Sequence, residues 1–256
     1  MTAYASTAEM CIGTAGWTIP REWQGSFPAG ESHLARYAGR FRAVEVNSSF
    51  YRPHRAATWR RWADTVPDHF RFSVKMPRAV THDQRLIAAD VLCEVFLEEA
   101  RGLGHRLGPV LVQLPPSLAF DASHALDFFA MLRGMHDGDI VCEPRHESWF
   151  AAAADRLLMD VRVARAGADP ARWPAAALPG GWPGLTYVRL HGSPRMYYSA
   201  YTPDYLDEIA TLLRERSGAG SQCWCMLDNT TLGAATGDAL GLASRLDGRP
   251  LRTARP

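Results

Sequence analysis

Short apolar segments of strand type alternate with longer amphipathic segments along almost the whole chain. The strand-type segments cover residues 11–17, 42–47, 71–76, 109–114, 139–145, 161–166, 185–191 and 222–228. Helical periodicity follows in most of the stretches between them, for example at residues 89–101, 123–133 and 204–216. Strands that alternate with helices pair in parallel, so the pattern predicts an α/β protein with a parallel sheet. Eight such units favour a closed TIM (β/α)8 barrel over the alternative, a doubly wound open sheet.

The length of the chain agrees with one barrel. It has 256 residues, and a (β/α)8 barrel has roughly 250. We therefore expect a single domain over residues 1–256, with its core in residues 11–243. The stretch 167–184 is rich in proline, glycine and alanine and is too short to separate two domains. It predicts an irregular loop in the place of one helix.

Ionisable side chains stand at the C-terminal ends of these apolar segments. In the clearest case, Glu143 and Arg145 fall on one face of a strand, while Ile140 and Cys142 fall on the other. The same alternation places further polar side chains on a single face of their strands: Glu45, Asn47, Lys75, Gln113, Arg189, His191 and Asp228. Because active sites of such barrels lie at the C-terminal ends of the strands, we expect these residues to converge there.

Composition narrows the class of protein. The chain has 28 basic and 27 acidic residues and a net charge of +1, which gives no general attraction to nucleic acid or anionic membranes. Of its five cysteines, Cys142, Cys223 and Cys225 lie on apolar strand faces and are expected to be small buried hydrophobes. No signal-peptide pattern occurs in residues 1–10, and no apolar run approaches a membrane span. We therefore expect a reduced, cytoplasmic protein without a membrane partner.

Several ordered motifs carry a resemblance to a known family. They are Gly13–Trp17, Val44–Arg52, Phe72–Lys75, Thr81–His82, Gln113–Pro116, Glu143–Trp149, Arg189–Gly192 and Asp228–Thr230. With them the chain resembles the domain of unknown function 72 family, the YecE-like proteins, over residues 11–243. The resemblance implies a TIM-barrel fold and implies no established reaction.

The polar face suggests acid/base chemistry on a small polar or anionic metabolite that bears phosphate or carboxylate. The candidate catalytic residues are Glu45, Lys75, Glu143, His146 and His191. A Schiff base at Lys75 is also possible in chemical terms, since a lysine among apolar neighbours and cations can have a lowered pKa. The candidate substrate-binding residues are Trp17, Asn47, Tyr51, His82, Gln113, Arg145, Arg189, Asp228 and Asn229.

Metal and anion sites are competing interpretations of the same residues. Ligands for Mg²⁺, Mn²⁺ or Zn²⁺ are offered by Glu45, Glu143, His191 and Asp228. The cations Lys75, Arg145 and Arg189 lie on the same face and would repel a metal ion. We therefore expect no metal and no cofactor. The loops after the last two strands contain Gly, Ser and Thr, as phosphate-binding loops of barrels often do.

Three alternatives to an enzyme stay open at this point. The charged residues can form an internal ion-pair network that only braces the barrel. The aromatic side chains that follow the strands can stack on bases in a nucleic-acid-binding or processing protein. A barrel that binds a small molecule without catalysis is the third alternative. Nothing in the sequence predicts the oligomeric state.

Overall fold

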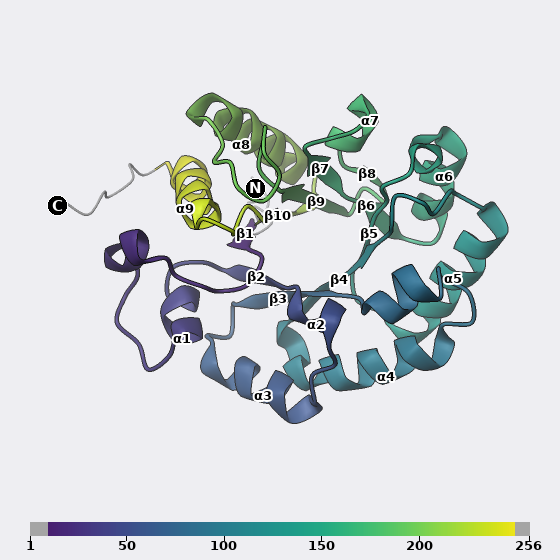
Figure 1. Ribbon diagram of the computed structural model, residues 1–256, viewed down its shortest axis with the longest axis horizontal. Helices are drawn as coiled ribbons and strands as arrows, with labels where there is room; N and C mark the ends of the chain where they lie inside the picture. The colour runs from purple at the N-terminus through teal and green to yellow at the C-terminus, as the bar shows by residue number, and fades with distance from the viewer. Residues whose placement is uncertain (1–9, 249–256) are drawn as a thin grey trace, which may run out of the picture.

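The structure is a computed structural model that describes residues 10–248. Figure 1 shows strands at the centre of the molecule and helices around them. The strands are β1 (Cys11–Thr14), β2 (Ala43–Val46), β3 (Arg71–Lys75), β4 (Leu107–Gln113), β5 (Ile140–Glu143), β6 (Val163–Arg165), β7 (Gly167–Asp169), β8 (Gly180–Gly181), β9 (Leu185–Leu190) and β10 (Gln222–Leu227).

Helices follow most of these strands. The α-helices are α1 (His33–Ala38), α2 (Ser48–Tyr51), α3 (Ala56–Thr65), α4 (Asp90–Ala100), α5 (Ala122–Met135), α6 (Ala152–Asp160), α7 (Pro174–Ala177), α8 (Pro203–Gly218) and α9 (Ala234–Asp247). Shorter helical segments are η1 (Arg21–Ser26), the π-helix η2 (Ala79–Asp83), η3 (Arg101–Arg106) and η4 (Glu147–Phe150).

The strands form two sheets, in the orders β1-β10-β9-β7 and β2-β3-β4-β5-β6-β8. Every pair is parallel except the short pair between β6 and β8. One residue, Ala166, separates β6 from β7, so a single run of chain leaves one sheet and enters the other. With β6 and β7 taken as one strand, eight parallel strands alternate with helices. The fold is therefore α/β and TIM-barrel-like.

A tyrosine hydroxyl interrupts the ladder between β1 and β2. The backbone N–H of Thr14 donates to the hydroxyl of Tyr37 on α1 at 2.8 Å, and that hydroxyl donates to the carbonyl of Ala43 at 3.2 Å. The two backbones approach closely there, because a Cβ on Gly13 would lie 2.0 Å from the Ala43 oxygen. One isolated parallel bridge, between Ala15 and Glu45, completes the contact of the two strands.

The second interruption lies between β6 and β9. The chain turns back after α7, and β8 pairs with β6 in an antiparallel sense. Arg165 holds this turn in place: it pairs with Asp155 at 3.0 Å and donates to the carbonyls of Ala175 and Leu178, each at 3.1 Å. The strand β8 thus occupies the edge of β6. As a result β9 pairs with β7 and not with β6.

The eight strand segments predicted from the sequence are confirmed, as is the parallel α/β order. The prediction of one closed sheet is met only in part, because the strands form two hydrogen-bonded sheets for the two reasons given above. The stretch 167–184, predicted as an irregular loop in the place of a helix, contains the strands β7 and β8, and its helix is reduced to the four residues of α7.

Apolar side chains pack in two groups. The larger group lies between strands and helices and includes Val44, Val46, Cys142, Cys225 and Leu227. A smaller, separate cluster uses the opposite strand parity: Cys11, Ala43, Leu111, Val141, Ala164, Ala166, Leu185, Tyr187, Trp224 and Met226. Most strands are therefore buried on both faces. The polar residues described below lie on the same strand face as the second cluster, nearer the C-terminal ends of the strands. All five cysteines lie within residues 10–248, are buried and form no disulfide bond, and the burial of Cys142, Cys223 and Cys225 is as expected.

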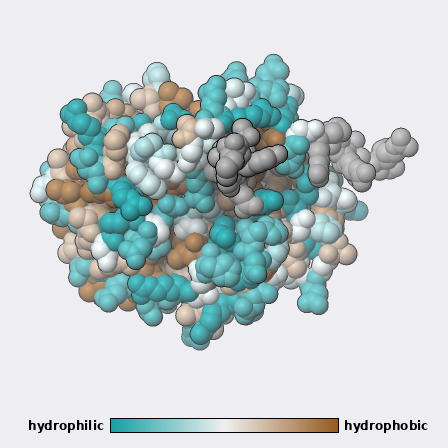
Figure 2. All heavy atoms as spheres, turned by 180° about the vertical axis from the view of Figure 1, so that it is seen from behind, coloured by the Kyte–Doolittle hydropathy of each residue, from teal (hydrophilic) through white to brown (hydrophobic). Residues whose placement is uncertain are grey.

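Within residues 10–248, no helix is long and apolar enough to cross a bilayer. The face seen in Figure 2 has hydrophilic and hydrophobic residues interspersed. The cytoplasmic location stays a prediction.

We expect Tyr37→Phe to lower the free energy of unfolding by about 1–3 kcal/mol, because it leaves buried backbone groups of β1 and β2 without a partner. Tyr37 is fully buried. Urea denaturation measures the change. The matched control is Tyr51→Phe, since the Tyr51 side chain is 79% exposed. Equal, small effects of both substitutions would show that the Tyr37 hydroxyl does not link the two strands.

Candidate functional site

Arg189 on β9 is the centre of a buried cluster of charges. Its guanidinium holds Glu45 of β2 with two hydrogen bonds, from Nε at 2.9 Å and from Nη2 at 2.6 Å. Nη1 donates to Glu143 of β5 at 2.5 Å. All three side chains are at most 1% exposed. Arg189 therefore joins the ends of three strands that belong to two different sheets.

His191 extends this network toward the solvent. Its Nδ1 lies 3.0 Å from Asp228, which follows β10, and its Nε2 lies 3.1 Å from Glu143. The Nη2 of Arg145 also lies 2.9 Å from Nε2 and pairs with Glu143 at 2.5 Å. Arg145 can only donate and Asp228 can only accept, so both of these contacts are hydrogen bonds when the proton of His191 is on Nδ1. In that tautomer the approach of Glu143 to Nε2 is not a hydrogen bond.

The cluster has an inner and an outer part. The side chains of Glu45, Glu143 and Arg189 are at most 1% exposed, whereas Asp228 is 13% and Arg145 is 19% exposed. Asn47 joins the outer part, since its amide donates to Asp228 at 3.4 Å. A ligand from solvent would meet Asp228, Arg145 and Asn47 before it met the glutamates.

Lys75, the last residue of β3, lies beside the cluster. Lys75 is 8% exposed, and its Nζ lies 4.1 Å from the ring centroid of Phe50. Among residues 10–248, no carboxylate lies within ion-pair distance of this ammonium, and no acceptor forms a hydrogen bond with it. Burial, and then the charge of Arg189, lower the pKa of Lys75 to about 8 against the opposing effect of the carboxylates.

Two carboxylates of the site, Glu143 and Asp228, are held in their charged form. Burial by itself raises the pKa of Glu143, but the charges of Arg145 and Arg189 outweigh it and hold that pKa well below the usual value. For Asp228, burial also raises the pKa, and the hydrogen bond with His191 together with Arg189 lowers it overall. Glu143 thus forms ion pairs with two arginines, Arg145 and Arg189.

Strand parity accounts for most of these positions. Glu45, Lys75, Glu143 and Arg189 share the strand face of the inner apolar cluster, and each is the last or the last but one residue of its strand. The same parity points to two residues that the sequence analysis missed, Tyr187 and Ser73. The Tyr187 hydroxyl contacts Glu45 at 2.9 Å and Ser73 at 2.7 Å, so it supports the network from below.

Other predicted site residues lie outside the charge cluster. Trp17 packs edge-on against Trp62 at 5.0 Å, and Tyr51 is 79% exposed. Gln113 lies opposite Glu143 in the sheet register, but its amide donates to its neighbour Leu114.

Three more predicted residues have local partners. His82 packs edge-on against Phe50 at 5.0 Å. His146 begins η4, where its Nδ1 accepts the backbone N–H of Ser148 at 3.3 Å. Asn229 is fully buried and donates to Asp238 at 2.7 Å.

One aromatic residue at the site comes from the loop after β9. The ring of Tyr197 packs edge-on against His191, with 5.8 Å between the centroids. Its backbone has a positive φ of 69°, a conformation that is uncommon outside glycine. The run of tyrosines after the strand was visible in the sequence, but the residue of that run that meets His191 depends on this local turn.

The geometry of the cluster argues against a metal centre at these residues. The Arg189 guanidinium fills the space between Glu45, Glu143 and Asp228, which are the carboxylates that a cation would need. Across residues 10–248, no group of three or more His, Cys, Asp or Glu side chains has a metal-binding arrangement.

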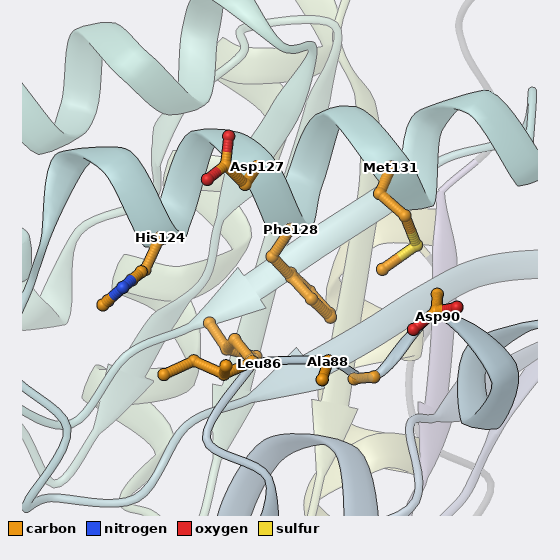
Figure 3. A pocket seen from close by; sticks show the side chains of 9 residues that line it. Leu86, Ala88, Asp90, His124, Asp127, Phe128 and Met131 are labelled. Carbon is orange, nitrogen blue, oxygen red and sulfur yellow. The ribbon is translucent and has the colours of Figure 1, made fainter.

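A cavity elsewhere is a poorer site for chemistry. A hollow of about 220 Å³ lies between the segment before α4 and the helix α5, and its lining includes Leu86, His124 and Phe128. Figure 3 shows Phe128 extending from α5 toward Leu86. None of the residues that line it belongs to the charge cluster.

These features define a TIM-barrel-like α/β protein with a buried ionic cluster at the C-terminal ends of its strands. The chain belongs to the DUF72 family, described as a protein of unknown function, whose model matches residues 11–256. The UPF0759 protein YecE of Escherichia coli strain K12 is 29% identical over 150 residues, which are 58% of this chain and 53% of YecE. The chain therefore matches about half the length of this curated relative.

Solved structures of the same family have this fold. A DUF72 family protein from Enterococcus faecalis matches with a TM-score of 0.78 and 17% identity, over 97% of this chain and 100% of that one. A DUF72 family protein from Thermotoga maritima matches with a TM-score of 0.76 and 22% identity, over 93% of this chain and 100% of that one.

We expect Arg189→Met to lower the free energy of unfolding by about 3–5 kcal/mol, because Glu45 would stay buried without a counter-charge. The double variant Glu45→Gln/Arg189→Met removes both charges and should be more stable than Arg189→Met alone. Urea denaturation compares the two. A double variant that is no more stable than the single one would contradict the coupling between these residues.

The contribution of Glu143 should depend on pH. Its pKa is depressed in the folded state, so the stability that it adds is present above the unfolded value of about 4.3 and is lost as the pH falls toward the folded value. The difference in unfolding free energy between wild type and Glu143→Gln should therefore shrink below about pH 4.3. The matched control is Glu94→Gln on the exposed side of α4, which should differ little from wild type at each pH. A difference for Glu143→Gln that grows at acid pH would contradict the assignment.

Proposed function

We propose that this protein is a metal-independent enzyme that acts on a small metabolite bearing a phosphate or carboxylate group. The substrate binds where the parallel strands end, above Arg189. In this proposal the eight strands work as one barrel. The Ala15–Glu45 bridge and the direct passage from β6 to β7 support that arrangement.

The observation that carries the proposal is the distribution of charge between the two parts of the site. In the inner part, Arg189 holds both glutamates, and Arg145 contributes a second contact to Glu143. At the outer edge, the cations Lys75 and Arg145 stand against one carboxylate, Asp228, which already pairs with Arg189 and His191. The three cations balance the three carboxylates of the cluster, and two of the cations, Lys75 and Arg145, stand at the outer edge, where they attract an anionic group.

Each outer residue has a role in this proposal. Lys75 and Arg145 attract the anionic group of the substrate. Asp228 is ionised and partly exposed, so it accepts a proton from the substrate. His191 is fully buried. It acts as a positioning residue, which orients Asp228 through Nδ1 and receives Arg145 at Nε2. Glu45 and Glu143 hold Arg189 in place. The pKa of Glu143 is well below its usual value, so Glu143 does not exchange protons near neutral pH.

Binding of inorganic phosphate tests the anion site. Calorimetry with wild type should show binding that weakens about tenfold or more in Lys75→Met and in Arg145→Met, since a charge-assisted hydrogen bond contributes about 1.5–3 kcal/mol. The matched control is Arg78→Met. Arg78 is an exposed cation that pairs with Asp83 at the surface, and its loss should leave phosphate binding unchanged.

Other outcomes of this experiment would favour other functions. Tight binding of Mn²⁺ that depends on Asp228 and Glu143, without phosphate binding, would revive metal-assisted chemistry. Binding of a single-stranded oligonucleotide that is indifferent to Lys75 would favour the nucleic-acid alternative. If phosphate binds but no anionic metabolite in a screen is turned over, the barrel is a binding protein. Turnover that is lost in Asp228→Asn while binding persists would support the enzyme.

A further inference from the structure

Lysine is nearly absent from this chain. Its 28 basic residues are 27 arginines and a single lysine, Lys75. Arginine can supply positive charge, hydrogen bonds and ion pairs, but it keeps its proton at every physiological pH. The property that distinguishes lysine is an amine that can lose its proton and become a nucleophile. The position of the one lysine therefore bears on what chemistry the site uses.

The surroundings of Lys75 are those of a reactive amine. The side chain ends the buried strand β3 at the edge of the charge cluster, and Nζ faces the ring of Phe50 at 4.1 Å. The two nearest glutamates of the cluster are already held by Arg189 and Arg145. Within the described part of the chain, no ion pair or hydrogen bond fixes the ammonium. A structural lysine at this depth would instead have a carboxylate partner.

We propose that Lys75 forms an imine with the carbonyl carbon of a ketone or aldehyde substrate that carries an anionic group. The inference rests on the proposed function for the anion site and narrows its substrate to carbonyl compounds.

The covalent step is a condensation that needs no further reactant. The neutral amine of Lys75 attacks the carbonyl carbon with its lone pair, a C–N bond forms, and the carbonyl oxygen takes up a proton to give a carbinolamine. The hydroxyl group then leaves with a second proton as water, and the C=N bond of the imine forms. Asp228, the outer carboxylate, is the group of this cluster that can take the proton that the amine loses.

The protonation of Lys75 is compatible with this step. Its pKa is lowered to about 8 by burial first and by Arg189 second. At pH 7 about one amine in ten is then neutral, whereas an ordinary lysine has a neutral fraction of about one in a few thousand.

Two atoms of the outer part are available to the rest of the substrate. Nε of Arg145 and Oδ1 of Asn47 are buried and have no hydrogen-bond partner among the described residues. Nε of Arg145 can donate to a phosphate or carboxylate oxygen, and Oδ1 of Asn47 can accept from a hydroxyl group. An anionic carbonyl compound that also bears a hydroxyl group would satisfy both.

Reductive trapping on the intact protein tests the imine. Wild type is incubated with pyruvate or with dihydroxyacetone phosphate, two anionic ketones, in the presence of sodium cyanoborohydride, and the adduct is located by peptide mass spectrometry. The chain has only one ε-amine, so the terminal α-amine is the internal reference for non-specific reaction. We expect an adduct at Lys75 at least tenfold above that reference with at least one ketone, and an initial rate that rises with pH up to about 8.

Lys75→Arg is the matched variant, since it keeps the charge and removes the nucleophile. It should retain phosphate binding and give no adduct, and circular dichroism with a urea titration checks that it folds. If the arginine does not fit, Lys75→Met is used in its place; it should also give no adduct, and it should bind phosphate about tenfold more weakly than wild type.

The outcomes separate the two proposals. No adduct at Lys75 with either ketone overturns the imine, whatever the variants do. If phosphate still binds in that case, the proposed anion site stands without covalent chemistry. If neither an adduct nor phosphate binding occurs, both proposals fail.

Discussion

The site depends on the ion pairs that Arg189 forms with Glu45 and Glu143. A guanidinium with five N–H donors can satisfy carboxylates that come from different directions, and here they come from β2 and β5 while Arg189 comes from β9. No single pair of these residues would be stable at this depth, because each charge needs the others to offset the cost of leaving water. The ends of three strands in two sheets are therefore fixed relative to one another by electrostatics as well as by backbone pairing. The outer residues Asp228 and Arg145 are held in position by their ion pairs with Arg189 and Glu143.

The sequence predicted the order of the elements well, because each strand segment is short, apolar and followed by a polar residue on a constant parity. The same parity rule placed Glu45, Glu143, Arg189 and His191 on one face, and the structure brings them into contact. The same rule places Tyr187 and Ser73 on this face. Their contact with Glu45 was not predicted, because tyrosine and serine are common in strands and do not by themselves indicate a site. Two features that interrupt the sheet were not predictable. One is the tyrosine of α1 whose hydroxyl lies between β1 and β2, and the other is the short antiparallel pairing of two glycines with β6. Both depend on tertiary contacts, which the periodicity of the sequence does not predict.

The residues that the structure keeps apart share a physical reason. His146 and Asn229 stand just beyond their strands, where side chains serve the local turn more often than the barrel mouth. His146 begins η4, and Asn229 anchors the loop after β9 through the carbonyl of Ser199. Trp17 and Tyr51 lie in connections whose path the sequence does not specify. Parity gives the face on which a side chain lies, and it holds for His191 and Asp228, the first residues after their strands. It does not give the partner, since Gln113 lies on the same face and donates to Leu114.

The order of strands in the two sheets has a consequence for how the chain reaches this state. The sheet from β2 to β6 joins neighbours in the chain, so it can be built from local contacts as successive units meet. The other sheet pairs β1, near the start of the chain, with β10, near its end. That pairing must close a loop that encloses nearly the entire molecule, and loop closure costs conformational entropy before any contact rewards it. Glu45 belongs to the local half and Arg189 to the distant half. The ionic cluster is thus completed only when the two halves dock, and neither half contains the site by itself.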